Sequence, residues 1–138
     1  MYPQKLKIYN GKIITPFKII QGGCVLITGD AITEVSEQNI ETENAIEINA
    51  EGKYVAPGFI DIHIHGGGGC DFMDANEAAF LKIAETHLQY GTTAMLPTTL
   101  TGSKDALLKT LAAYESANKK IQVVRNFSGC TWKALISQ

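Results

Sequence analysis

Polar and apolar residues alternate in short stretches through the first 55 residues, and a period of two predicts β-strands. Residues 5–9 alternate in this way, and Asn10-Gly11 follows as a predicted hairpin turn. Further strands are predicted at residues 11–15 and 24–27, at 31–35 after the Gly29-Asp30 turn, and near Ile46 and Ile48 after an acidic loop. We expect this part to form a small antiparallel β layer.

The pattern changes after Pro57-Gly58. Residues 59–65 alternate strictly, which predicts a strand, and the glycine run 66–69 follows it. Asp74 is predicted to cap a helix, with Glu77 three residues later as in a capping box, and Gly91 to end it. The apolar stripe of this helix is predicted to contain Phe80, Ile83, Ala84, His87 and Leu88.

The same order of elements then repeats. A strand is predicted at residues 92–96, closed by Pro97, and Ser103 is predicted to cap a second helix. Leu107, Leu111 and Tyr114 are expected on one face of that helix, and the next strand is predicted at residues 121–124. Strands that alternate with helices predict an α/β fold with parallel pairing through right-handed crossovers.

Composition excludes several classes of protein. The 138 residues carry 12 Lys and Arg against 14 Asp and Glu, too little positive charge for binding that neutralises nucleic-acid phosphates. With 45% hydrophobic residues the chain is too apolar to be disordered, yet no apolar run reaches the length of a membrane span. Neither a signal peptide nor a paired cysteine motif occurs, so we expect a cytoplasmic protein without disulfides.

The strand at residues 59–65 carries the candidate chemistry. Residues i and i+2 point to the same face of a strand, so Asp61, His63 and His65 are expected to project together. Two imidazoles on one rigid strand can hold a divalent metal such as zinc or iron. A metal in such a site activates water near neutral pH and polarises a carbonyl group.

Simpler interpretations exist for each of these features. A His-x-His pair on an amphipathic strand also occurs as plain packing or surface. His87 is assigned to helix packing, Asp71 to the loop and Asp74 to helix capping. The glycine run is either a flexible connector or, in the interpretation we prefer, a substrate-facing loop beside the metal.

Residues 57–66, Pro-Gly-Phe-Ile-Asp-Ile-His-Ile-His-Gly, resemble the amidohydrolase superfamily. Within it, residues 65–74 and 90–101 resemble the N-acetylglucosamine-6-phosphate deacetylase family, and the likeness extends from about Tyr9 to about Phe127. The family implies a (β/α)8 barrel beside a small β-sandwich domain. It also implies hydrolysis of the N-acetyl group of an amino-sugar phosphate, giving glucosamine-6-phosphate and acetate.

The resemblance assigns only His63 and His65, as metal ligands, to positions of this sequence. It implies a zinc or iron cofactor, with one or two ions in the full-length enzyme, and a homo-oligomer. The remaining ligands, the catalytic acid and the substrate-binding residues are expected further along a longer chain, so no catalytic residue is assigned here. The expected domains are 1–55, the first part of the β domain, 56–127, the first β/α units of the barrel, and 128–138, an aberrant tail.

The tail from Phe127 departs from the family pattern. Restoring one T to an allowed codon string for residues 127–138 gives Phe-Leu-Gly-Met-His-Leu-Glu-Gly-Pro-Tyr-Phe-Ser, which matches the segment that the family places there. The Glu is forced, because TGG for Trp132 followed by AA for Lys133 always contains GAA. We therefore interpret the tail, including Cys130, as the product of a shifted reading frame.

Three functional interpretations follow. The preferred one is the N-terminal piece of a metal-dependent deacetylase, incomplete as given and inactive and poorly folded when made alone, because a closed barrel needs eight strands. The alternatives are a non-catalytic β/α module and a related amidohydrolase with a different amide substrate.

Overall fold

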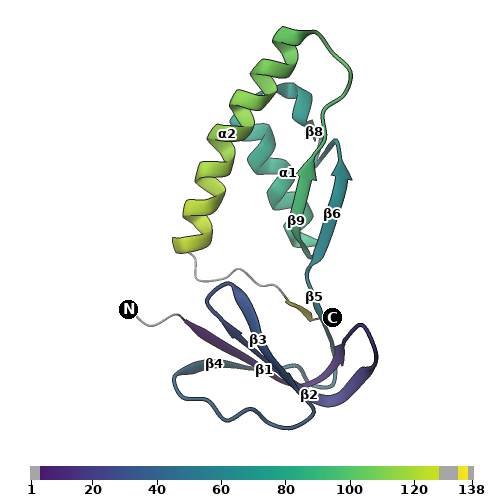
Figure 1. The fold of residues 1–138 in the computed structure, drawn as a ribbon, viewed down its shortest axis with the longest axis vertical. Helices are drawn as coiled ribbons and strands as arrows, with labels where there is room; N and C mark the ends of the chain where they lie inside the picture. Colours follow the sequence, from purple (N-terminus) through teal and green to yellow (C-terminus); the bar gives the residue numbers. More distant parts are fainter. Residues whose placement is uncertain (1–3, 128–133, 137–138) are drawn as a thin grey trace. The chain divides into compact units, whose positions relative to one another are not determined.

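A computed structural model describes residues 4–127 and 134–136, with side chains described for residues 4–121 (Figure 1). The chain divides into two compact units, one of Met1–Gly58 with Thr131–Gln138 and one of Phe59–Cys130. We call their described parts the β unit and the β/α unit. No helix in the described part of the chain is long and apolar enough to cross a membrane.

A mixed sheet forms the β unit. Its strands are β1 (Lys5–Ile14), β2 (Ile19–Thr28), β3 (Ala31–Ser36), β4 (Ala45–Asn49), β5 (Tyr54–Pro57) and β10 (Ala134–Ile136). The order is β10-β5-β1-β2-β3, with β4 also beside β1. Strands β1, β2 and β3 are antiparallel as predicted, but β4 and β5 both run parallel to β1. The expectation of an entirely antiparallel layer is therefore wrong. The loops before β4 and β5 return the chain so that each strand enters the sheet in the same direction as β1.

The predicted turn at Asn10-Gly11 is also wrong, because both residues lie inside β1. Asn10 adopts a left-handed conformation with φ 57°, and the register with β2 shifts between Ile8 and Gly11. The chain on both sides pairs with the same strand, so this is a β-bulge and not a hairpin. The bulge separates the half of β1 that pairs with β4 from the half that pairs with β5.

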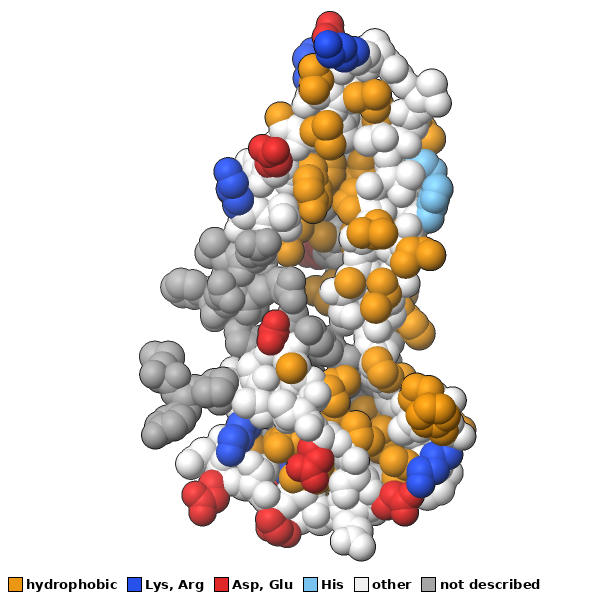
Figure 2. Space-filling view, in the orientation of Figure 1, with side chains coloured by type: hydrophobic (Ala, Val, Ile, Leu, Met, Phe, Trp, Pro, Cys, Tyr) orange, Lys and Arg blue, Asp and Glu red, His pale blue; other side chains and the backbone are white. Residues whose placement is uncertain are grey.

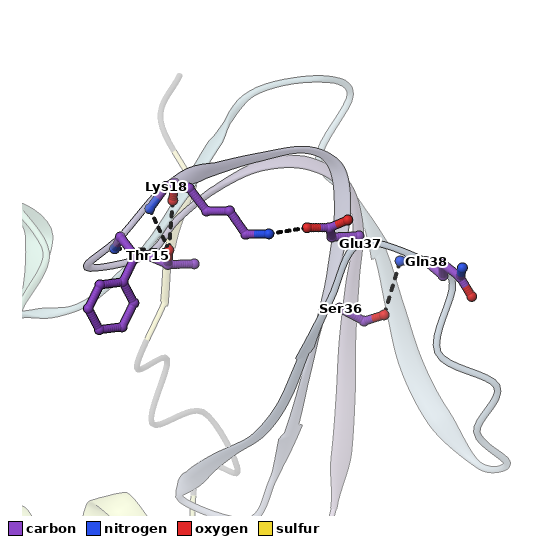
Figure 3. Close-up of polar contacts among 6 residues, drawn as sticks. Thr15, Lys18, Ser36, Glu37 and Gln38 are labelled. Carbon is purple, nitrogen blue, oxygen red and sulfur yellow. Dashed lines mark hydrogen bonds and ion pairs between the residues drawn. The ribbon is translucent and has the colours of Figure 1, made fainter.

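The turn between β1 and β2 lies at residues 15–18 instead (Figure 3). The Thr15 hydroxyl accepts a hydrogen bond from the Lys18 amide at 3.1 Å and donates to the Lys18 carbonyl at 2.7 Å. The Lys18 ammonium pairs with Glu37 just after β3, which ties the turn to the next strand. The core beneath the sheet consists of Ile8, Ile13, Ile20, Val25, Ile27, Ala50 and Val55.

The β/α unit follows the predicted alternation of strands and helices. Its elements are β6 (Phe59–Ile64), β7 (Gly66–Gly67), β8 (Cys70–Asp71), the short 3-10 helix η1 (Phe72–Asp74), α1 (Glu77–Gln89), β9 (Thr92–Pro97) and α2 (Lys104–Phe127). β6 and β9 lie side by side and parallel, joined through α1, so the predicted parallel pairing of these strands is confirmed (Figure 1). Gly91, with φ 89°, follows the end of α1 as predicted. The Ser103 hydroxyl accepts a hydrogen bond from the Ala106 amide and so caps α2, also as predicted.

Helix α1 begins later than predicted. Ala75 adopts a left-handed conformation with φ 52°, which ends η1 and prevents one continuous helix from Asp74. Asn76 is the residue that caps α1, accepting from the Ala79 amide at 2.9 Å. The Asp74 carboxylate instead accepts from the Asp71 amide, and Asp71 caps η1 by accepting from the Met73 amide. Asp74 as the cap of α1 is therefore wrong.

The core of this unit lies where the helices meet β6 and η1. It contains Ile64, Phe72, Phe80, Ile83, Ala113 and Ala117. Phe80 and Ile83 confirm the predicted stripe of α1, whereas Leu88 is 58% exposed. On α2 the buried positions include Thr110, Ala113 and Ala117, and Leu111 is 54% exposed. Tyr114 of the predicted face also contacts α1, through the ring of Phe80.

The predicted strand at residues 121–124 is wrong, because α2 continues through it to Phe127. A short apolar run does not distinguish a strand from a helix, and residues 104–127 contain no Gly or Pro to end the helix. Most of the predicted aberrant tail, with Cys130, lies outside the described residues. Its described part is β10, which pairs antiparallel with β5.

Candidate metal centre

The two predicted ligands meet at the carboxyl end of β6. His63 lies within the strand and His65 directly follows it. Their Nε2 atoms are 3.3 Å apart, and the rings are nearly perpendicular, at 78°. Figure 2 shows histidine side chains at the surface, close to apolar ones. The carboxyl ends of parallel strands are where α/β proteins place their active sites.

The backbone after β9 fixes the orientation of His65. Nδ1 of His65 lies 3.0 Å from the Thr98 carbonyl oxygen, which can only accept, so Nδ1 carries the proton. The lone pair of the neutral ring is then on Nε2, the atom that faces His63. The Thr98 amide donates to the Ile64 carbonyl at 2.8 Å, which holds Thr98 against the end of β6. Such a carbonyl partner is the usual support of a metal-binding histidine.

Asp61 does not join the pair as the alternation predicted. Its carboxylate accepts a hydrogen bond from the His63 amide at 3.1 Å and is thereby engaged with its own strand. Within residues 4–121, whose side chains are described, no set of three or more His, Cys, Asp or Glu side chains is placed to hold a metal ion. The described residues therefore offer a pair of nitrogen ligands and no third protein ligand.

The spacing of the two nitrogens fits a single metal ion. Nitrogens bound to a tetrahedral zinc at about 2.0–2.1 Å lie about 3.3–3.4 Å apart. The observed separation of 3.3 Å, which also suits a hydrogen bond between the two rings, lies within this range. Imidazole nitrogens also suit zinc and ferrous iron by their chemistry.

The glycine run folds as a hairpin beside the pair. Gly66 and Gly67 in β7 pair antiparallel with Asp71 and Cys70 in β8. The Phe72 amide donates to the His65 carbonyl at 2.9 Å, and the Phe72 side chain is buried in the core. A regular hairpin anchored at Phe72 is not the flexible connector of the simpler interpretation.

Two residues contact the His63–His65 segment in ways that the sequence did not predict. Thr98 is one, because it contacts His65 through its backbone carbonyl, which every residue type has. His87 is the other: it was assigned to packing, and its Nε2 lies 3.2 Å from the Gly66 carbonyl oxygen. Cys24 and Cys70, the cysteines within the described residues, are unpaired, as predicted.

Comparisons with known proteins agree on one family. The amidohydrolase family matches residues 54–127. N-acetylglucosamine-6-phosphate deacetylase of Bacillus subtilis is 37% identical over 99 residues, covering 71% of this chain and 25% of the relative. A dihydroorotase of Caldanaerobacter subterraneus subsp. tengcongensis is 41% identical over 61 residues, 44% of this chain and 14% of that protein.

Solved structures extend the likeness to the fold. The crystal structure of N-acetylglucosamine-6-phosphate deacetylase from Pasteurella multocida superposes with a TM-score of 0.74 at 26% identity, covering 83% of this chain and 31% of that one. The chain thus spans about a quarter of the length of the curated deacetylases it matches.

Proposed function

The chain belongs to the amidohydrolase family, and its β/α unit is the start of a hydrolase barrel of that family. On this premise we propose that the chain supplies the first metal ligands of an N-acetylglucosamine-6-phosphate deacetylase. The observation that carries the proposal is the convergence of the His63 and His65 Nε2 atoms at a separation suited to one ion. The deacetylases among the relatives support the choice of substrate.

In this proposal His63 and His65 bind the ion through Nε2, and the Thr98 carbonyl holds the proton on Nδ1 of His65. A divalent metal bound there supplies Lewis-acid polarisation of an amide carbonyl and makes water a nucleophile near neutral pH. The hairpin 66–71 follows the pair in the chain, and in this proposal it faces the substrate.

Zinc or iron is the proposed ion, with one or two bound in the complete enzyme. The unpaired Cys24 and Cys70 suit the reducing cytoplasm in which we propose it works. A homo-oligomer is the proposed assembly of the complete enzyme.

The test uses the complete gene product, meaning the full-length chain expressed with the reading frame restored after Phe127. It measures acetate release from N-acetylglucosamine-6-phosphate after chelation and after zinc is restored. We expect zinc-dependent turnover that His63→Gln or His65→Gln lowers by at least about 100-fold, because each removes a ligand. Gln89→Ala, an exposed change on α1, is the control. Equal turnover by the two His variants and the control would refute the proposal.

A related amidohydrolase acting on another amide is the second candidate. The 41% identity to a dihydroorotase over 61 residues favours it. Dihydroorotate hydrolysis measured beside acetate release separates the two, because only one substrate should turn over. A non-catalytic module turns over neither and shows no loss on mutation of the pair.

A further inference from the structure

Helix α1 contacts the hairpin 66–71, which follows the His63–His65 pair. The His87 ring, from the last turn of α1, places Nε2 3.2 Å from the Gly66 carbonyl oxygen. A carbonyl can only accept, so His87 donates its Nε2 proton. Its ring is half-buried, and the contact joins residues 21 positions apart in the sequence.

The glycines of the hairpin lie directly against side chains of α1. A Cβ built on Gly67 would lie 2.4 Å from His87 Nε2, and one on Gly68 would lie 2.3 Å from Thr86 Oγ1. Gly67 does not have a positive φ, so an alanine there would conflict with the position of the His87 ring and not with the backbone conformation. The glycines are therefore what lets His87 reach the backbone.

The carbonyl that His87 holds belongs to Gly66, the residue directly after His65. On the other side of it, the Phe72 amide donates to the His65 carbonyl at 2.9 Å. The ring of His65 is held separately by the Thr98 carbonyl. The backbone and the ring of His65 are thus each restrained, and His87 supplies the restraint that comes from a helix.

We infer that His87 is a positioning residue for the His63–His65 pair, which it aligns by donating a hydrogen bond to the Gly66 carbonyl. The inference rests on the proposed metal site and extends it to a residue that does not touch the ion. It replaces the interpretation of His87 as packing alone. Plain packing requires a ring of this size at position 87, whereas positioning requires an N–H group at the place of Nε2.

The test measures Co²⁺ affinity of the complete gene product by its visible absorption. His87→Phe keeps a ring but removes the donor, and we expect about tenfold weaker binding, the lower end of the range for residues that support metal ligands. His87→Gln places an amide N–H near the Nε2 position and should retain most of the affinity. Gln89→Ala on the same helix should bind as the wild type does. The inference would be overturned if His87→Phe bound Co²⁺ as tightly as the wild type does, or if His87→Gln bound it as weakly as His87→Phe.

A double-mutant cycle of Gly67→Ala and His87→Ala tests the contact between His87 and the hairpin. The added methyl group displaces the imidazole, so Gly67→Ala and His87→Ala should each weaken Co²⁺ binding, while the double variant is no weaker than His87→Ala alone. Losses that add in the double variant contradict the contact.

Hydrogen exchange of the Phe72 amide separates this inference from the proposed function. It should quicken in His87→Phe whether or not metal is present, because the hairpin loses its tie to α1. A wild type that takes up no Co²⁺ refutes the proposed metal site. Unchanged exchange at Phe72 in the variant refutes the role of His87.

Discussion

His65 is held at two of its own atoms and through the residue that follows it, and this defines the candidate centre at the scale of single residues. Its Nδ1, its carbonyl oxygen and the Gly66 carbonyl oxygen are hydrogen-bonded to Thr98, Phe72 and His87. The alternation of the strand was enough to predict that His63 and His65 share a face. Their supporting partners could not be predicted, because two are backbone groups and the third is 22 positions away.

The caps show the limit of local sequence patterns. Asp74 and Glu77 have the spacing of a capping box, yet Ala75 is left-handed and Asn76 begins the helix. Nothing in the residue type of Ala75 indicates φ 52°, because alanine rarely adopts it.

Replacement of Asn76 tests this correction. Asn76→Ala removes the acceptor for the Ala79 amide and should lower the free energy of unfolding by about 1 kcal/mol. Urea unfolding followed at α1 measures it, with Gln89→Ala as the control at the other end of the helix. A loss no larger than that of the control contradicts the assigned cap.

At the scale of elements, local periodicity predicted the β6–α1–β9 crossover but not the directions of strands in the β unit. β4 and β5 lie parallel to β1 because of long-range pairing, which alternation does not encode. The interval 121–124 was assigned to a strand on three apolar residues and a glutamine, and α2 includes it because no Gly or Pro ends the helix.

The contact of α1 with α2 depends on pH through Glu77. Its carboxylate accepts hydrogen bonds from the Lys120 ammonium and the Ser116 hydroxyl, and these, with the charge of Lys120, lower the pKa of Glu77. A lowered carboxyl pKa stabilises the fold above the unfolded value near 4.5 and ceases to do so as the pH falls through the folded value.

We therefore expect unfolding of α1 in urea to shift to lower urea as the pH falls from 6 to 3, and Glu77→Gln to reduce that shift. Residue-resolved NMR measures α1 and β2 separately. Glu37→Gln is the matched control, because its carboxylate pairs with Lys18 in the β unit and its pKa is also lowered. An unchanged shift at α1 in Glu77→Gln contradicts the assigned pair.

At the scale of the whole molecule, the amidohydrolase match ends at residue 127, where the sequence itself loses the family pattern. The shifted reading frame proposed for residues 128–138 accounts for this. The large apolar side chains Phe59, Ile60, Ile62 and Leu96 on the paired strands are exposed in this chain.

Sequencing the source DNA tests the proposed shift of the reading frame after Phe127. We expect the neighbouring frame after the Phe127 codon to encode the Met-His-Leu-Glu-Gly-Pro-Tyr segment. A coding strand without that segment in either neighbouring frame contradicts the shift and leaves the tail as a genuine departure from the family.

The central claim is that His63 and His65 bind one divalent metal. Anomalous diffraction at the zinc edge, from crystals of the zinc-loaded complete gene product, tests it most directly. The account predicts a peak bonded to both Nε2 atoms at about 2.0–2.1 Å, with Nδ1 of His65 still on the Thr98 carbonyl. A zinc peak that contacts neither histidine, or no peak at this end of β6, would contradict it.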